Sequence, residues 1–198
     1  TSWDIVLNGG GSIDKISQVI EDDYQVIDID LFDTSKETIS DLKASKKVIC
    51  YFSAGSQEGW RSDSDEFKNG DVGNALDGWP DEKWVDVKSD NVRNIMKKRI
   101  KMAAENGCTA IDPDNVDGFV SQDGFGYDKS AYVDYLRFLA QEAQTNNLAI
   151  GLKNAVDLIP EVVNFMQFAI NEQCHEFREC DQYKPFTAAN KAVFNIEY

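Results

Sequence analysis

The chain has 198 residues, 42% of them apolar, which is enough to bury one sizeable core and short for two. Thirty-five acidic residues against 20 basic ones give a formal net charge of −15, a field that repels phosphate backbones and anionic lipid surfaces. No stretch approaches the ~20 apolar residues of a membrane helix. We therefore expect a single domain over residues 1–198 that binds neither nucleic acid nor membranes. Its negative field either attracts a cationic ligand or only keeps the protein in solution.

Apolar runs of strand length recur along the chain, with helical patterns between them. The expected strands are 3–7, 26–31, 47–52, 109–112, 148–152, 165–170 and 192–196. The clearest helix begins after Ser89 and Asp90, ends at Gly107 and carries its apolar residues on one face. A second helical pattern follows Asp128, and a weaker one follows Ser35.

The alternation of strands and helices predicts the fold class. Successive strands joined by helices need crossover connections, which give a parallel α/β sheet. Seven strands fit a (β/α) barrel of the TIM type better than a small open sheet, with a doubly wound sheet as the alternative. Because a complete barrel has eight strands, we expect one in which the last strand and helix are missing or truncated, unless an early element escapes the pattern.

Two segments lie outside this alternation. Residues 53–88 are rich in Gly, Ser and Asp and follow the carboxyl end of a strand, where long loops shape the active site of a barrel. The run Asn8-Gly-Gly-Gly-Ser12 lacks the lysine of a P-loop and the spacing of a dinucleotide fingerprint, so we interpret it as a flexible turn.

The four cysteines contain no C-x-x-C pair, which disfavours a structural zinc site. Cys174 and Cys180 enclose a loop short enough for a disulfide, which would suit an oxidising compartment, with two free thiols as the alternative. Two interpretations stay open for Cys50 and Cys108: a pair across neighbouring strands, or two buried thiols. The single histidine, His175, is expected on a surface loop, which leaves little room for histidine-based nucleophilic catalysis.

Acidic residues gather at the carboxyl ends of the expected strands, which share one face of a parallel barrel. They are Asp28, Asp30, Asp33, Asp112, Asp114, Asp117, Glu172 and Glu197. Crowded like charges cost stability, so such a ring favours a functional site. Hydrolysis of a glycosidic bond needs one carboxyl that protonates the leaving oxygen and a second that acts as nucleophile or activates water. The ring meets this need but leaves the pairing open.

Other residues of this face either support a sugar site or offer an alternative. Lys153 and Asn154 can donate hydrogen bonds into the ring, and a lysine there would hold its neighbours ionised. Aromatic rings suited to the faces of sugars are Tyr51, Trp60, Trp79 and Tyr198. The alternative is a metal-dependent hydrolase using Asp112, Asp114 and Asp117, although their spacing departs from that of a calcium loop.

Six blocks of sequence together carry a family resemblance. They are Asp28-Ile-Asp-Leu-Phe-Asp33, Cys50-Tyr-Phe-Ser-Ala-Gly-Ser56, Gly78-Trp-Pro80, Asp112-Pro-Asp-Asn-Val-Asp-Gly118, Gly151-Leu-Lys-Asn-Ala155 and Asn171-Glu-Gln-Cys174. In this order they resemble glycoside hydrolase family 114 over nearly the whole chain. The resemblance implies a (β/α) barrel that acts as a secreted endo-α-1,4-polygalactosaminidase. Free galactosamine is cationic, which agrees with the acidic charge balance.

The resemblance also implies the site residues. The catalytic pair carries over as Asp114 and Glu172. Candidates for binding sugar hydroxyl or amino groups are Asp30, Tyr51, Asp112, Asn115, Lys153, Asn154 and Glu197. We assign Glu172 as general acid/base and Asp114 as nucleophile or electrostatic partner kept ionised by Lys153, two roles that are open to exchange.

For its partners, we expect a monomer that acts on a cationic galactosamine-containing polysaccharide without a metal or cofactor. A non-catalytic sugar-binding barrel is the other alternative, since a barrel lacking its eighth strand would be incompletely closed.

Overall fold

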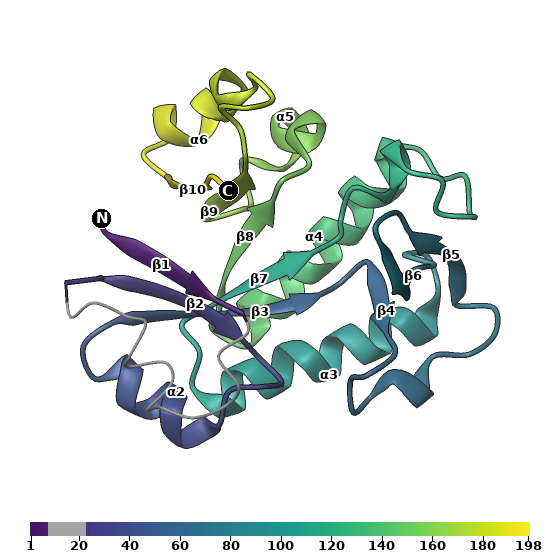
Figure 1. Ribbon diagram of the computed structural model, residues 1–198, viewed down its shortest axis with the longest axis horizontal. Coiled ribbons are helices and arrows are strands. Elements are labelled where there is room, and N and C mark those ends of the chain that lie inside the picture. Colours follow the sequence, from purple (N-terminus) through teal and green to yellow (C-terminus); the bar gives the residue numbers. More distant parts are fainter. Residues whose placement is uncertain (8–22) are drawn as a thin grey trace.

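The computed structural model describes residues 1–7 and 23–198, and its main body is a parallel sheet of seven strands (Figure 1). In spatial order the strands are β1 (Trp3–Val6), β2 (Val26–Asp30), β3 (Lys47–Ser53), β7 (Ala110–Asp114), β8 (Ala149–Lys153), β9 (Phe168–Glu172) and β10 (Ala192–Ile196). Their spatial order follows the chain in one direction, whereas a doubly wound sheet reverses. The expected TIM-type barrel is confirmed. The turn predicted at residues 8–12 lies outside the described residues.

The sheet curls until its edge strands approach each other. β1 and β10 stand at the two ends of the strand order, yet the rings of Trp3 in β1 and Phe194 in β10 have centroids only 5.0 Å apart. All seven expected strands are present in the described part of the chain. The one seam that they leave open lies between β1 and β10, where an eighth strand would close the barrel.

Alternation along each strand separates two apolar cores. Ile27 and Ile29 of β2 join the larger core, which lies between the sheet and the surrounding helices. Val26, on the opposite face of β2, joins a smaller cluster inside the barrel with Ile49, Ala110, Phe168, Ile170 and Phe194. This apolar layer fills one end of the barrel, so that the carboxyl ends of the strands are left for polar residues.

The three predicted helices are confirmed as α2 (Lys36–Lys43), α3 (Asp90–Asn106) and α4 (Lys129–Thr145). Ser35, Ser89 and Asp128 cap them by accepting hydrogen bonds from backbone N–H groups of the first turn. α3 ends at Gly107, whose φ of 98° is favourable for glycine. The remaining helices are short: α5 (Ile159–Val162), α6 (Lys184–Ala188) and the 3-10 turns Ser64–Glu66, Gly118–Val120, Val156–Leu158 and Cys180–Tyr183. None of the described helices is both long and apolar enough to cross a bilayer.

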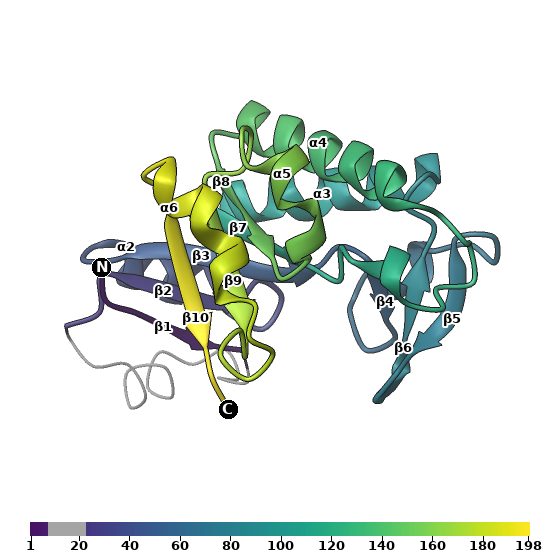
Figure 2. The ribbon, with the colours of Figure 1, turned by 90° about the horizontal axis from the view of Figure 1, so that it is seen from above.

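The segment 53–88 is more ordered than the expected long loop. It forms a second, antiparallel sheet from β4 (Ser56–Glu58), β6 (Trp79–Val85) and β5 (Val72–Leu76), at the end of the molecule away from β10 (Figure 2). The turn between β5 and β6 is Asp77-Gly78, with Gly78 at φ 80°, a dipeptide typical of tight hairpins. The prediction of a long loop was therefore wrong for this segment, although Asp77-Gly78 is a sequence signal for a hairpin.

Both possible disulfides are present. Cys174 and Cys180 are bonded, which confirms the short closed loop, with Cα atoms 4.8 Å apart. Cys50 and Cys108 are bonded as well, with Cα atoms 6.0 Å apart. Cys50 lies in β3 and Cys108 just before β7, and the two strands are neighbours, so the tertiary structure decides the question that the sequence left open.

Candidate active site

The inner half of the site lies at the carboxyl ends of β3, β7 and β8. The Tyr51 hydroxyl donates to Oδ2 of Asp114 at 3.0 Å, and Lys153 Nζ lies 3.6 Å from the same oxygen. Lys153 Nζ also lies 3.4 Å from Oδ2 of Asp112. The side chains of Lys153 and Asp112 are only 2% and 0% exposed. One buried ammonium group therefore forms salt bridges with two carboxylates.

The local sequence of β7 explains how both acids reach this face. Asp112 and Asp114 are two residues apart in a strand, so their side chains share one face of the sheet. Pro113 lies between them and has no N–H to donate. The pairing of β7 with β8 includes Ala110 and Ile111 and ends there, before Pro113. Asn115, directly after the strand, turns with φ 59°, and its N–H donates to Oδ1 of Asp114 at 2.7 Å. Asp114 thus has three donors around it.

Burial shapes the ionisation of this inner half. It raises the pKa of Asp112 to about 6, with Lys153 opposing that rise and Asp114 adding to it. For Lys153, burial acts to lower the pKa, but the surrounding carboxylates outweigh it and hold the pKa above its ordinary value. Burial also raises the pKa of Tyr51, and Asp114 raises it further. Lys153 and Tyr51 consequently remain proton donors at neutral pH.

Asp28 lies beneath Asp112 inside the barrel. The sequence predicts it as part of the acidic ring but not as a site residue. It is fully buried, and burial followed by the neighbouring Asp112 raises its pKa well above the usual range. Both oxygens of Asp28 and Oδ1 of Asp112 lack a hydrogen-bond donor when both groups are ionised. A proton on Asp28, donated to Oδ1 of Asp112, would satisfy two of these three atoms, and the raised pKa of Asp28 favours this neutral form.

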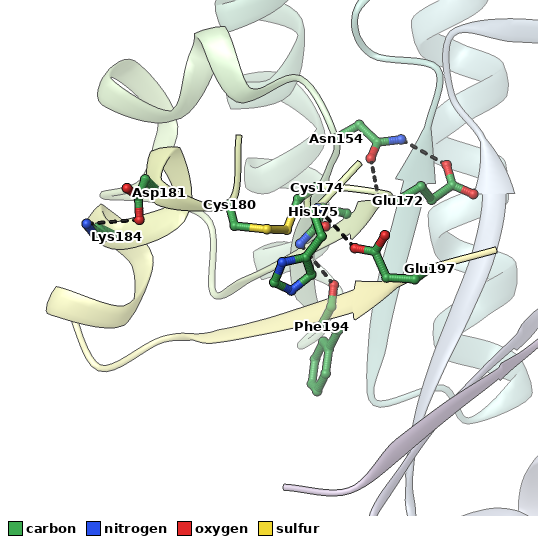
Figure 3. The surroundings of a disulfide bond; sticks show 10 residues. Asn154, Glu172, Cys174, His175, Cys180, Asp181, Lys184, Phe194 and Glu197 are labelled. Atoms are coloured by element: carbon green, nitrogen blue, oxygen red, sulfur yellow. Dashed lines mark hydrogen bonds and ion pairs between the residues drawn. A yellow bond between two sulfur atoms is a disulfide. The ribbon is translucent and has the colours of Figure 1, made fainter. Parts of the chain in front are cut away.

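The outer half of the site is centred on Glu172 at the end of β9. Oε2 of Glu172 accepts from Asn154 Nδ2 at 3.0 Å, and the Glu172 N–H donates back to Asn154 Oδ1 at 2.9 Å (Figure 3). Oε1 accepts from the Tyr198 hydroxyl at 2.5 Å. The direct partners of Glu172 are therefore neutral donors, in contrast to the ammonium group beside Asp114.

The backbone turns sharply directly after three strands of the site, β7, β8 and β9. Positive φ angles occur at Asn115 after β7, at Asn154 and Ala155 after β8, and at Gln173 after β9, with values from 48° to 60°. This region is uncommon for residues other than glycine, and least so for asparagine. Such strain collects where a fold positions functional groups. Ala155 and Gln173 carry no sequence signal for it.

Several of the predicted residues contact one another, whereas three have partners elsewhere in the protein. Asp30 forms a salt bridge with Arg61 at 2.6 Å, and Arg61 also pairs with Glu58. These buried ion pairs connect the small sheet to the barrel. The Asn115 side chain donates to Ser53 Oγ at 2.8 Å. Glu197 Oε1 accepts from the backbone N–H of His175 at 3.1 Å. Binding of sugar by these three stays a prediction.

Glu82 from β6 is a further acidic residue near the site, and no sequence pattern predicts it. Its carboxylate is buried and accepts from Ser56 Oγ at 2.8 Å, and Ser56 Oγ lies 2.5 Å from Ser53 Oγ. Burial raises the pKa of Glu82, and Asp114 contributes to the rise. A tertiary contact across the second sheet brings it near the site.

The arrangement disfavours the metal alternative. Lys153 supplies a cation between Asp112 and Asp114, in the position that a metal bound by these two acids would need. Asp117, the third acid of this alternative, has no salt bridge among the described residues. Burial, and then Asp114, raise its pKa to about 6.

Comparison with known proteins gives the family. The model of glycoside hydrolase family GH114 matches residues 1–198. The chain belongs to this family. This family 114 protein is 46% identical to Ega3 of Aspergillus fumigatus, solved in complex with galactosamine, over all of this chain and 77% of that one, with a TM-score of 0.92. It is accordingly a glycoside hydrolase. No curated protein matches it.

More distant structures share the fold of this family 114 hydrolase. The glycoside hydrolase domain of PelA from Pseudomonas aeruginosa is 14% identical, covers all of this chain and 84% of its own, and has a TM-score of 0.76. Sucrose 6F-phosphate phosphorylase from Thermoanaerobacter thermosaccharolyticum is 12% identical over 87% of this chain and 58% of its own, with a TM-score of 0.61.

Proposed function

We propose that this hydrolase cleaves α-1,4 linkages within galactosamine-containing polysaccharides, using Asp114 and Glu172. The observation that carries the proposal is the contrast between two carboxylates on one face of the barrel. Asp114 lies beside the Lys153 ammonium group, whereas Glu172 lies between the neutral donors Asn154 and Tyr198. Glycosidic hydrolysis requires two carboxyl groups whose environments differ in this way.

The environments favour one assignment of roles. Lys153, Tyr51 and the Asn115 N–H all stabilise a negative charge on Asp114, which suits a nucleophile or a group that stabilises an oxocarbenium-like transition state. Glu172 has no direct cationic partner among the described residues, and this environment suits a general acid/base. Glu172 gives a proton to the leaving-group oxygen as the C–O bond breaks, and recovers one from the attacking water.

The charge of the protein supports the substrate class. An unacetylated galactosamine residue carries an ammonium group at neutral pH, and a protein with a net charge of −15 concentrates such cations. The complex of the related Ega3 with galactosamine supports the same class. Two disulfides indicate an oxidising compartment, so we expect a secreted enzyme. That it acts as a monomer stays a prediction.

The test uses deacetylated α-1,4-galactosamine oligomers and counts new reducing ends. Asp114→Asn and Glu172→Gln are each expected to lower kcat by about 10³-fold or more without changing the melting temperature by more than a few degrees. Glu161→Gln, a matched change of charge on exposed Glu161 in α5, keeps full activity. Activity that survives both substitutions contradicts the proposal.

Two further measurements separate the alternatives. Oligomer binding by calorimetry without any product indicates a non-catalytic sugar-binding barrel. Loss of activity after exhaustive chelation, restored by added metal, indicates the metal-dependent hydrolase.

A further inference from the structure

A cavity of about 290 Å³ lies beside Glu172, and neither Lys153 nor Asp112 lines it. Its walls come from the segments that follow β7, β8 and β9. Glu172 belongs to the wall, so the cavity is continuous with the outer half of the site. A volume of this size suits one sugar ring more than an extended oligomer.

Apolar side chains on the rim of this cavity are exposed to solvent. Five large apolar side chains are exposed among the described residues: Trp60, Trp79, Val120, Phe177 and Tyr198. Val120 and Phe177, exposed by 65% and 62%, both line the cavity together with Phe119. Apolar groups gathered around a hollow, rather than scattered singly, are typical of a binding site. Aromatic rings of this kind contact the C–H faces of sugars.

The polar part of the lining is acidic. It contains Asp117, Asp157, Glu172 and Glu179, and neither lysine nor arginine. Only Asp157 among them has a salt bridge within the described chain, to Lys129 at 3.2 Å. Glu179 and Asp117 therefore have no cation of their own, and together they favour a ligand that brings one. A neutral sugar would leave these charges without a partner, and an anionic sugar would be repelled.

We infer that this cavity binds a second amino sugar of the polymer, with a free ammonium group, next to the sugar whose bond is cleaved. This inference rests on the proposed function. The ring contacts Phe177 and Val120, and its ammonium group lies toward Glu179 and Asp117. With Glu172 as the general acid, this sugar is on the leaving-group side of the bond, because the acid protonates the leaving oxygen.

The test compares substitutions in the cavity with a matched control outside it. Phe177→Ala and Glu179→Gln are each expected to raise KM for deacetylated oligomers about fivefold with kcat nearly unchanged. Phe177→Tyr, which keeps the aromatic face, restores the wild-type KM. Glu161→Gln makes the same change of charge as Glu179→Gln on exposed α5 and leaves KM as it was. In calorimetry with the N-acetylated oligomer, which carries no ammonium group, Glu179→Gln is expected to leave the affinity unchanged.

A second readout does not depend on catalysis. Calorimetry of the deacetylated oligomer with the Asp114→Asn protein is expected to show about fivefold weaker binding when Phe177→Ala or Glu179→Gln is added. If the wild type cleaves the oligomer but both cavity variants match Glu161→Gln in KM and in calorimetry, the inference fails and the proposed function stands. If the wild type cleaves nothing, the proposed function fails, and calorimetry alone decides whether the cavity binds the amino sugar.

Discussion

The two halves of the site hold their carboxylates by different chemistry. In the inner half, Asp112 and Asp114 share the buried ammonium group of Lys153. In the outer half, Glu172 is half-buried and its direct partners are the neutral donors Asn154 and Tyr198. An adjacent cation stabilises the charge of a carboxylate, whereas neutral donors place no opposite charge beside it. This difference in partners is the basis of the roles that we propose for Asp114 and Glu172.

Removing Lys153 is expected to have the largest effect, because it takes away the cation that distinguishes the inner half of the site. Lys153→Met leaves two carboxylates without their cation, so we expect the free energy of unfolding at pH 7 to fall by about 3 to 5 kcal/mol, and kcat by about 100-fold. Chemical denaturation and reducing-end assays measure these effects. The double variant Asp112→Asn/Lys153→Met, which removes both buried charges, is expected to regain part of the stability.

Lys129 provides the matched control. It forms an exposed pair with Asp157, in which the side chains are 48% and 50% exposed, and Lys129→Met is expected to cost less than about 1 kcal/mol. Equal costs for Lys153→Met and Lys129→Met would show that the inner pairing does not stabilise the barrel.

Each half of the site has a disulfide nearby: Cys50–Cys108 joins β3 to the start of β7, and Cys174–Cys180 closes the loop after β9. Cys50 and Cys108 are 58 residues apart, so Cys50→Ala/Cys108→Ala is expected to lower the free energy of unfolding by about 4 kcal/mol. Cys174 and Cys180 are 6 residues apart, and their removal is expected to cost about 2 kcal/mol.

Activity is expected to respond in the opposite order. The Cys174–Cys180 loop begins two residues after Glu172, so Cys174→Ala/Cys180→Ala loosens the acid and lowers kcat about tenfold. The Cys50–Cys108 variant, assayed well below its melting temperature, keeps most of its kcat. An equal loss of kcat in both variants would contradict a specific role for the outer loop.

Asp117 tests how burial acts on a carboxyl that has no cationic partner. Burial and Asp114 raise its pKa from about 4 to about 6, so the folded state holds the proton more tightly than the unfolded state does. Its contribution to stability is therefore complete below about pH 4 and is lost as the pH rises through 6. Asp117→Asn removes this dependence. We expect the variant to gain about 2 kcal/mol on the wild type between pH 4 and pH 8, and an unchanged difference would refute the raised pKa.

Tyr198→Phe gives the smallest expected effect. It removes the donor to Glu172 Oε1 but keeps the ring, and Tyr198 is 84% exposed, so kcat falls about fivefold while the free energy of unfolding changes by less than about 0.5 kcal/mol. Reducing-end assays and thermal unfolding provide both values. A loss of kcat as large as that of Glu172→Gln would mean that Tyr198 takes part in proton transfer itself.

Local patterns in the sequence determined the parallel barrel. The apolar strand runs, together with the caps at Ser35, Ser89, Asp128 and Gly107, predicted all seven strands and the three long helices. The reason is that periodicity and capping depend on neighbours along the chain. Segment 53–88 shows the limit, because its polar strands lack an apolar run, and only Asp77-Gly78 marked the hairpin.

The sequence placed Asp114 and Glu172 at strand ends, but contacts between distant elements decided what surrounds them. Asp30 binds Arg61 across 31 residues, Tyr198 reaches Glu172 across 26, and Glu82 arrives from the second sheet. The pairing of Cys50 with Cys108 needed the adjacency of β3 and β7. Residue spacing fixes which face a side chain takes, whereas burial, ion pairing and pKa depend on groups that meet only when the barrel curls.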